Sequence, residues 1–484
     1  MPHDHHGLKS FAGLSKLCSH GAMRSDRFGR MAPSAAPLYV DPQALEAIGA
    51  KNGPMQHSGS ALKTQAVPVA HIFFGQFVDH DITLDISSSF ARLDRAEDTT
   101  NVRTPTLDLD CIYGDGPEGS PYLYYHKRPK FSGVKLLTGA DMPSPTPFQT
   151  DDLLRTPDDR AIIGDPRNDE NRVVSQLQLG MIRFHNKVVD HLDAEGVPEG
   201  ELFEEAARMV RWHYQWIVVN DYLKTLVGAP LLADILGHGR RIYRPEHCTF
   251  NAPYGGGPFI PVEFSVAAYR FGHSMIPQRI QIQHGKSALD VFGPTLGHGF
   301  CPLSDADAVV HWPQVLDLSD STVDRADQLD AKMAKDLLDL PFVAAGGVKS
   351  LAVRNLLRGQ AFLLPSGETF AELCERPAAE VGTVTAKARA LASDAGHARA
   401  LDGGTPLWLY ILIEAGEIGQ EKAPGTFIKG EGLGPVGGRI VAETLIGLQE
   451  LDSHAYLGSD RSWSPARAGL KPGGVNTLLD LMMY

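Results

Sequence analysis

The chain has 484 residues and a formal net charge of −13, with 45 Lys and Arg against 58 Asp and Glu. This length is compatible with about three domains or with one large catalytic unit, and it allows a sizeable hydrophobic core. Because no basic cluster offers a footprint for phosphate groups, the acidic balance argues against nucleic acid as a partner.

Cysteine usage and apolar runs exclude further classes. The five cysteines are scattered and lack a CxxC spacing, so neither a disulfide framework nor a zinc site is predicted. They are Cys18, Cys111, Cys248, Cys301 and Cys374. The start of the chain has no apolar signal core, no run reaches transmembrane length, and no Asn-x-Ser/Thr sequon occurs. We therefore expect a soluble protein without a membrane span, either cytoplasmic or exported without a leader.

The apolar pattern predicts a mainly α protein in two parts. Residues 1–66 are rich in Gly, Ser, Pro and His, and we expect them to form an irregular arm packed on the main body, with a short helix at residues 42–48. Residues 67–484 are expected to form one large domain, because helical patterns recur and strand signals are few. Helices besides those discussed below are expected at residues 326–338, 407–415, 435–451 and 475–483.

An apolar run at residues 67–74 leads directly into a polar cluster. On a helix Gln76 and His80 share one face, whereas Asp79, His80 and Asp81 point in three directions. A histidine between two carboxylates is costly to bury unless each charge has a partner, and a metal or a cofactor would provide one. The alternative is a helix end whose aspartates are exposed to solvent.

The polar loop that follows carries oxygen at every second residue. Thr104, Thr106, Asp108 and Asp110 would share one face of an extended segment and could converge on a hard cation. The central glycine and terminal glutamate of an EF-hand are missing. A solvated acidic turn is the alternative.

Two long helices are predicted after this loop. The first begins after a turn that carries Arg167 and Glu170, which are three residues apart and share a face where the helix begins. A surface salt bridge is the alternative interpretation of this pair. The second covers residues 204–223, where apolar residues at spacings of three and four form one stripe. His213 beside this stripe is expected to be a satisfied buried imidazole rather than a ligand.

Residues 262–276 read as a helix that Pro277 ends, with His273 in the last turns among apolar neighbours. A single strong metal ligand in an apolar wall suits an axial haem histidine better than a hydrolytic metal, which needs two or three close ligands.

Taken together, the sequence resembles the animal-type haem peroxidases of the peroxidase–cyclooxygenase superfamily, the family of myeloperoxidase, lactoperoxidase, peroxidasin and their bacterial-type members. The resemblance extends over roughly residues 60–450, and it rests on five motifs in the family's order. These are residues 75–81, 104–114, 167–170, 269–273 and 355–358. It implies a large single helical domain around a central haem, with little β structure.

The resemblance also implies roles for particular residues. The catalytic residues would be Gln76, His80 and Arg167. His273 would bind the haem iron and Asn355 would accept its other ring N–H. Haem b would further be held by Arg270 and Arg358, and ester-linked through Asp79 and Glu170. Calcium would be bound by Asp81, Thr104, Thr106, Asp108 and Asp110.

The implied activity is reduction of hydrogen peroxide, with oxidation of small anions (iodide, thiocyanate, bromide) or phenolic donors. Two positions depart from the mammalian members. Asp110 replaces a serine and adds negative charge to the calcium loop. Asn171 replaces the methionine that forms a third haem link in myeloperoxidase, so we expect chloride to be a poor donor.

Two other functions stay open at this point. A fatty-acid dioxygenase of the cyclooxygenase-like branch needs a radical-forming tyrosine three residues before the proximal histidine, where this chain has Arg270. A haem-binding protein without turnover would have no need of Gln76, His80 and Arg167 together.

Overall fold

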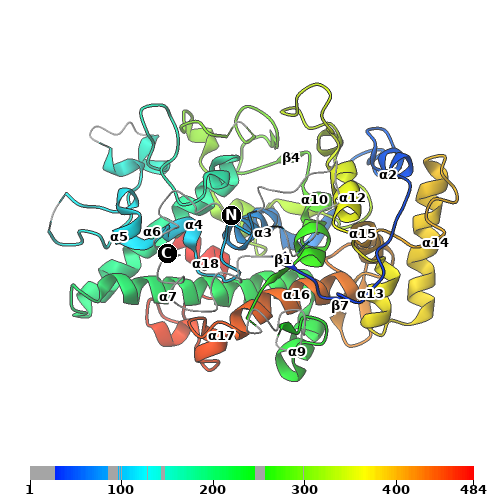
Figure 1. The fold of residues 1–484 in the computed structure, drawn as a ribbon. Coiled ribbons are helices and arrows are strands. Elements are labelled where there is room, and N and C mark those ends of the chain that lie inside the picture. Colours follow the sequence, from blue (N-terminus) through cyan, green and yellow to red (C-terminus); the bar gives the residue numbers. More distant parts are fainter. Residues whose placement is uncertain are drawn as a thin grey trace, which may run out of the picture.

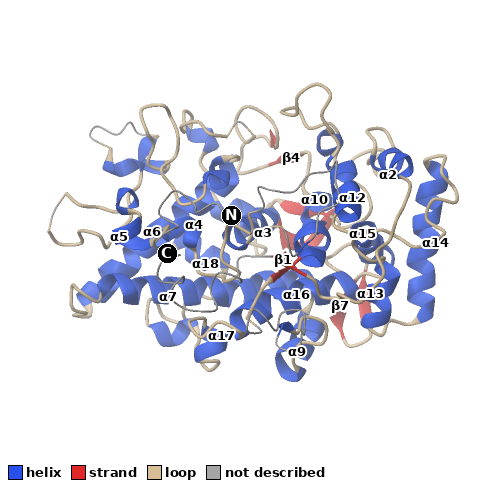
Figure 2. Ribbon diagram, in the orientation of Figure 1, coloured by secondary structure: helices blue, strands red, loops and turns tan. Residues whose placement is uncertain are grey.

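The computed structural model describes residues 28–84, 96, 99, 101–127, 129–142, 148–245, 257–297 and 299–484. Within these ranges the protein is built mainly from helices, and its strands are short and paired two by two (Figure 2). The predicted mainly α fold with little β structure is confirmed.

The helices surround α3, which lies near the middle of the molecule (Figure 1). The α-helices of seven or more residues are α2 (Pro42–Gly49), α3 (Val69–Ile82), α6 (Arg172–Ala194), α7 (Leu202–Ile217), α9 (Ala229–His238), α12 (Leu351–Ala361), α13 (Gly367–Leu373), α14 (Ala378–Asp394), α15 (Leu407–Glu417) and α16 (Pro435–Glu450). The shorter ones are α4 (Asp110–Tyr113), α5 (Gly116–Gly119), α8 (Lys224–Val227), α10 (Gly272–Met275), α11 (Trp312–Leu316), α17 (Tyr456–Ser459) and α18 (Leu478–Met483).

The strands described form four two-stranded sheets. One is parallel, between β1 (Phe28–Gly29) and β3 (Ile260–Pro261). Three are antiparallel: β2 (Lys63–Pro68) with β6 (Arg325–Asp327), β4 (Arg279–Ile280) with β5 (Leu289–Asp290), and β7 (Gln420–Ala423) with β8 (Thr426–Ile428).

Helix α3 is buried almost all round, as its apolar sequence predicts. It follows Pro68 and packs on α6, α10, α11 and β2. Every residue of the helix is buried except Gln76 and Asp79. Neighbouring elements therefore cover α3 and place His80 inside the protein, while Gln76 and Asp79 keep part of their surface accessible.

Helices α6 and α7 confirm the two long helices expected from the sequence. Helix α6 begins where the side chain of Asn171 accepts a hydrogen bond from the backbone N–H of Val174. Helix α7 continues into a π-helical segment, Val218–Leu223, which presses the hydroxyl of Tyr222 against Gly75 of α3. A Cβ atom at residue 75 would collide with that hydroxyl, so only glycine fits there.

The segment that carries His273 is helical but not one regular helix. It runs through a π-helical part, Glu263–Ala267, and a 3₁₀ part, Ala268–Phe271, into the single turn of α10. At Ala267 the backbone leaves helical geometry, with φ −124° and ψ −72°. The buried carboxylate of Glu263 accepts hydrogen bonds from the backbone N–H groups of Met31 and Ala32, which attaches the N-terminal segment to this wall.

The helix expected at residues 326–338 is wrong. Its first residues form β6, which pairs with β2, and only the 3₁₀ turn Lys335–Leu338 is helical. Salt bridges from Lys63 to Asp324 and Asp327 reinforce the pairing. A partner strand 260 residues away in sequence therefore overrides the local helical pattern.

The N-terminal segment is attached to the main body at several points in its described part. Helix α2 packs on α12, and β1 and β2 each pair with strands of the main body. Residues 1–27 of the predicted arm lie outside the described residues, and the domain boundary at residue 66 stays a prediction. Within the described ranges, each helix is either too short or too polar to cross a membrane.

Candidate functional site

His80 lies where α3 meets the 3₁₀ turn Pro166–Asp169. Its Nδ1 is 2.7 Å from Oδ1 of Asn168, whereas its Nε2 has no hydrogen-bond partner among the described residues. Burial, followed by the positive charge of Arg167, lowers the pKa of His80 to about 4. The imidazole is therefore neutral near pH 7, with one nitrogen held and one open.

Arg167 is fixed by three oxygen acceptors. Its Nη2 donates to the backbone carbonyls of His80 at 2.9 Å and Thr83 at 2.8 Å, which end helix α3. Its Nε and Nη2 also donate to the Asp165 carboxylate, the latter at 2.7 Å. Its Nη1 makes no hydrogen bond to a described residue, so this end of the guanidinium can serve a ligand.

Asp165 is the charged group that holds this arginine. It is fully buried, it caps the 3₁₀ turn by accepting the N–H of Arg167, and it also accepts a hydrogen bond from Arg103. Although burial by itself raises the pKa of a carboxyl group, hydrogen bonding by Arg167 and the charges of both arginines lower the pKa of Asp165 to about 2. The carboxylate is therefore ionised throughout the neutral and mildly acidic range.

Gln76 is held between two side chains from the start of α6. Its Nε2 donates to Oε1 of Glu170 at 2.5 Å, and its Oε1 accepts from Nδ2 of Asn171 at 3.2 Å. Glu170 keeps a large accessible surface, yet burial raises the pKa of its carboxyl group. Asp79, the other accessible residue of α3, accepts a hydrogen bond from the Thr83 hydroxyl at 2.9 Å.

His273 lies on a second wall, the irregular helical segment that ends in α10 and contacts α3. The side-chain Nδ2 of Asn355, on α12, lies 2.9 Å from Nδ1 of His273, and Nε2 of the imidazole has no hydrogen-bond partner among the described residues. Burial, followed by the charge of Arg270, lowers the pKa of His273 to about 3, although the residue is only half-buried. With the amide in this orientation Nδ1 accepts the hydrogen bond. Turning the amide over would present Oδ1 to an Nδ1–H and free Nε2 as a ligand.

The two arginines expected at the cofactor are Arg270, on the segment that carries His273, and Arg358, on α12. Nε of Arg270 donates to the carbonyl of Ser265 at 2.9 Å, and the Arg270 carbonyl accepts from Nε1 of Trp408. The guanidinium of Arg358 lies 5.7 Å from the ring centre of Phe362. Arg270 thus belongs to the segment of His273 itself, and Arg358 lies on α12, the helix that carries Asn355.

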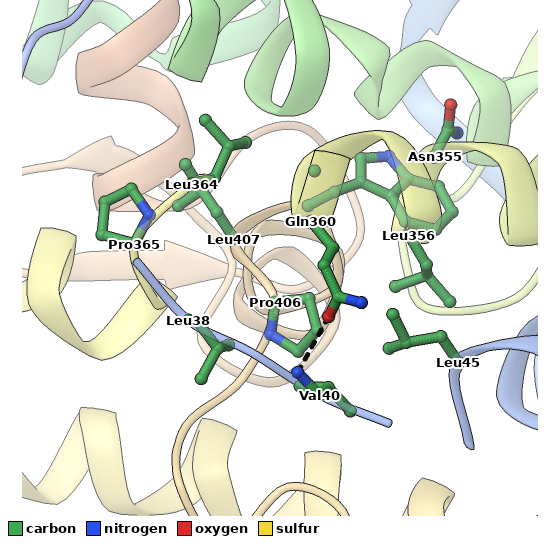
Figure 3. Close-up of a pocket in the computed structure, with 12 residues that line it drawn as sticks. Leu38, Val40, Leu45, Asn355, Leu356, Gln360, Leu364, Pro365, Pro406 and Leu407 are labelled. Carbon is green, nitrogen blue, oxygen red and sulfur yellow. Dashed lines mark hydrogen bonds between the residues drawn. The ribbon is translucent and has the colours of Figure 1, made fainter. Parts of the chain in front are cut away.

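A small apolar cavity lies behind Asn355, between α12 and the N-terminal segment (Figure 3). Its volume of about 20 Å³ is room for one water molecule, so it is a packing seam rather than a ligand site. Across this seam the backbone N–H of Val40 donates to Oε1 of Gln360 at 2.8 Å.

These residues fit a haem group. Two neutral imidazoles each keep an Nε2 without a hydrogen-bond partner among the described residues. The two walls are in contact, because Gly272 packs against Ile72 of α3. His273 is the better candidate ligand for the iron, because no carboxylate acts on its ring, whereas Asp165 and Asp79 lie around His80.

Three carboxylates gather below His80 in a second candidate site. Oxygen atoms of Asp81, Asp108 and Asp110 lie within 4.8 Å of one another. Asp81 is fully buried beside the Tyr214 hydroxyl, and burial followed by the charges of Asp108 and Asp110 raises the pKa of its carboxyl group. Arg103 offsets only part of this clustered negative charge, which a hard cation such as Ca²⁺ would stabilise.

The loop has the alternation that the sequence predicts, with Thr104, Thr106, Asp108 and Asp110 half-buried and the residues between them buried. The threonine hydroxyls donate to Oδ2 of Asp108, at 2.8 and 2.9 Å, rather than to an open position. Asp110 is also engaged, by Nη1 of Arg103 at 2.8 Å. Arg103 therefore joins this cluster to the Asp165 carboxylate.

The structure brings together several polar residues that the sequence did not single out. Asn168 and Gln178 lie behind His80, and Asp165 and Arg103 lie behind Arg167. Asn171, noted in the sequence only for the haem link that it cannot form, holds Gln76. The only local signal was Asp165, two residues before Arg167 and followed by proline, which is the pattern of a capped turn. The other contacts join segments far apart in sequence.

Comparison with known proteins identifies the family of the chain. The model of the animal haem peroxidase family matches residues 85–381. The chorion peroxidase of Drosophila melanogaster is 29% identical over 194 residues, which are 38% of this chain and 23% of that protein. A peroxidase-like protein of Margaritifera margaritifera is 25% identical over 288 residues, covering 49% of this chain and 35% of that protein.

Solved structures agree at the level of the fold. Peroxidase A from Dictyostelium discoideum superposes with a TM-score of 0.58 over 92% of this chain and 91% of that chain. A fatty acid alpha-dioxygenase from Arabidopsis thaliana gives a TM-score of 0.62 over 95% of this chain and 77% of that chain. Both are 15% identical to it, so these likenesses concern the fold alone.

The chain therefore belongs to the animal haem peroxidase family, and the resemblance found in the sequence is confirmed. Its matches to the curated relatives cover 23% and 35% of their lengths. The activities of those larger proteins accordingly enter below only as proposals.

Proposed function

We propose that this protein is a haem peroxidase that reduces hydrogen peroxide with His80 and Arg167 as its catalytic residues and His273 as the axial ligand. The single observation that carries the proposal is that two side-chain nitrogens are open, one able to accept a proton and one able to donate a hydrogen bond. Among the described residues, neither Nε2 of the neutral His80 nor Nη1 of Arg167 has a hydrogen-bond partner, whereas Nδ1 of His80 and the Nε and Nη2 of Arg167 are held by protein.

Haem, when held by His273, would supply the electrons for cleavage of the peroxide bond, and donor substrates would restore them. Nε2 of His80 takes the proton from one peroxide oxygen and returns it to the other, which leaves as water. Nη1 of Arg167 donates a hydrogen bond to the oxygen on which negative charge develops. Because Asp165 and two carbonyls already orient the guanidinium, little reorganisation is needed as the bond breaks.

The donors proposed are small anions and phenols. The amide of Gln76 is held by Glu170 and Asn171 one helical turn before His80, and it would orient peroxide, water or a small anion. Asn171 is neutral and cannot withdraw electron density from the haem as a positively charged link would. We therefore expect iodide, thiocyanate and bromide to be oxidised readily and chloride poorly at neutral pH.

Asp79 and Glu170 are proposed to form ester links to haem. They are carboxylates from two different segments that meet at His80, and both keep accessible surface. After treatment with peroxide, acidic organic solvent should leave haem attached to the wild type and extract it from the Asp79→Ala/Glu170→Ala variant. Free extraction from the wild type would mean that these carboxylates only hydrogen-bond.

A calcium ion is proposed at Asp81, with Asp108, Asp110 and oxygens of Thr104 and Thr106. For the hydroxyls to reach the ion, they must leave Asp108, whose carboxylate then turns to the cation. Since Asp81 follows His80 directly in α3, the ion would hold the end of α3 in place.

The function is tested on haem-loaded protein with three assays in parallel: its absorption spectrum, peroxide-dependent oxidation of iodide, chloride and a phenol, and oxygen uptake with a long-chain fatty acid. We expect a haem spectrum and donor oxidation, without fatty-acid-dependent oxygen uptake. Oxygen uptake without donor oxidation would support a dioxygenase instead. Bound haem with neither activity would support a binding protein.

A further inference from the structure

Behind His80 runs a line of buried polar groups that ends on a backbone carbonyl. Oδ1 of Asn168 lies 2.7 Å from Nδ1 of His80, and Nδ2 of Asn168 donates to Oε1 of Gln178 at 2.8 Å. Nε2 of Gln178 in turn donates to the carbonyl oxygen of Cys111 at 2.9 Å. All four residues are buried, Asn168, Gln178 and Cys111 completely.

The last link in this line determines the direction of all the others. A peptide carbonyl can only accept, so Gln178 must present its NH₂ group to Cys111 and its oxygen to Asn168. Asn168 must then donate to Gln178, which leaves its own oxygen facing the imidazole. That oxygen can only accept, so Nδ1 of His80 must carry the proton.

A neutral imidazole has only one N–H, so its Nε2 must hold a lone pair. Nε2 is the nitrogen without a protein partner, and it is the one that a base would use. We propose that Asn168 and Gln178 are positioning residues that lock His80 in the tautomer able to accept a proton at Nε2. As an account of catalysis this rests on the proposed function, but the tautomer itself does not.

The direction of these hydrogen bonds is fixed, because neither amide can turn over by itself. Turning over either amide would oppose two acceptors or two donors inside the protein, where each unsatisfied group costs about 1–3 kcal/mol. Water cannot substitute for a lost partner, since the three links are buried. Asn168 and Arg167 are consecutive residues of one 3₁₀ turn, so this turn also sets the position of the base relative to the arginine.

The test compares the wild type with Gln178→Leu. This variant removes the partner that orients Asn168 but leaves the groups that would touch peroxide. We expect a loss of about 10- to 100-fold in the rate of reaction with peroxide, the equivalent of one misdirected buried hydrogen bond. Adding Asn168→Asp should restore most of that rate, because both oxygens of a carboxylate accept and need no orienting partner.

Asn186→Leu is the matched control. Asn186 is also an amide on α6 and makes two hydrogen bonds to the backbone of Leu136, both at 2.8 Å, away from His80. It should lose stability as Gln178→Leu does, with its peroxide rate unchanged.

A second readout does not depend on turnover. In protein labelled with ¹⁵N-histidine, with diamagnetic ferrous haem bound to carbon monoxide, the ¹⁵N shifts of His80 report which nitrogen is protonated, and His80→Gln assigns the signals. We expect protonated Nδ1 in the wild type and a mixture of tautomers in Gln178→Leu. A protonated Nε2 in the wild type, or a Gln178→Leu variant with unchanged tautomer and rate, would overturn the inference. The expected tautomer without peroxide turnover would instead refute the proposed function.

Discussion

The walls that carry the two histidines are built in opposite ways. Around His80 the polar contacts form a continuous network of amides, carbonyls and buried charges, and Arg167 is held by a fully buried carboxylate. Around His273 the helix is irregular, the imidazole has one amide partner, and the seam behind that amide is apolar. Both roles require a fixed tautomer, but the base must in addition be placed against Arg167, and the network around His80 connects these two residues.

The largest expected effect is on haem binding, which should depend on His273 and not on His80. His273→Ala should fail to retain haem, because it removes the axial ligand, while His80→Ala should retain it. Haem content and the absorption spectrum after gel filtration measure this difference. Added imidazole should restore haem binding to His273→Ala by entering the space left by the side chain. Stoichiometric haem in His273→Ala without imidazole would contradict the assignment.

A second prediction concerns the buried charge behind Arg167. Asp165→Asn leaves two arginines without their carboxylate and should cost about 3–5 kcal/mol of unfolding free energy, together with a slower reaction with peroxide. Asp169→Asn is the matched control, because Asp169 is also buried and binds Arg155 through two hydrogen bonds of 2.8 Å. It should lose comparable stability and keep its peroxide rate. Equal rates in the two variants would mean that Asp165 is only structural.

The acid sensitivity of the fold should come in part from histidines outside both walls. His213 is fully buried, and burial lowers its pKa to about 4. The unfolded chain binds this proton first, so the stability contribution is complete above about pH 6.5 and lost as the pH falls to about 4. The loss for this group is about 3 kcal/mol.

His213→Phe should therefore flatten the dependence of unfolding free energy on pH between 6.5 and 4, as measured by urea denaturation. Phenylalanine suits a position packed between Phe184 and Trp463. His126→Gln, at an exposed histidine, is the control and should leave the slope unchanged. An unchanged slope in His213→Phe would show that His213 is not the source.

The smallest expected effect is removal of calcium from below the distal wall. A ligand present at 100 times its Kd stabilises the folded state by about 2.7 kcal/mol, so chelation should lower the melting temperature of the wild type. Asp81→Asn should melt at a lower temperature and no longer respond to the chelator, whereas the exposed Asp320→Asn should respond as the wild type does. Elemental analysis that finds no calcium in protein prepared with calcium would contradict the proposed site at Asp81.

How much could be predicted from the sequence differs between the same two regions. Helices α3 and α6 follow from local apolar patterns, and His80, Arg167 and His273 follow from motifs that resemble a family. Residues 326–338 were misread because β2 supplies hydrogen bonds that no local pattern shows. The supports of the distal wall were missed for the same physical reason, since the contact of Asn168 with His80 spans 88 residues.

The central claim is that His80 moves the proton of peroxide while His273 holds the haem, and rapid mixing tests it most directly. Haem-loaded wild type and His80→Ala are mixed with hydrogen peroxide and the haem absorbance is followed on the millisecond scale. We predict a reaction about 10²- to 10⁴-fold slower in His80→Ala with haem content unchanged, as expected for loss of general acid–base catalysis. A His80→Ala variant that reacts as fast as the wild type would contradict the account.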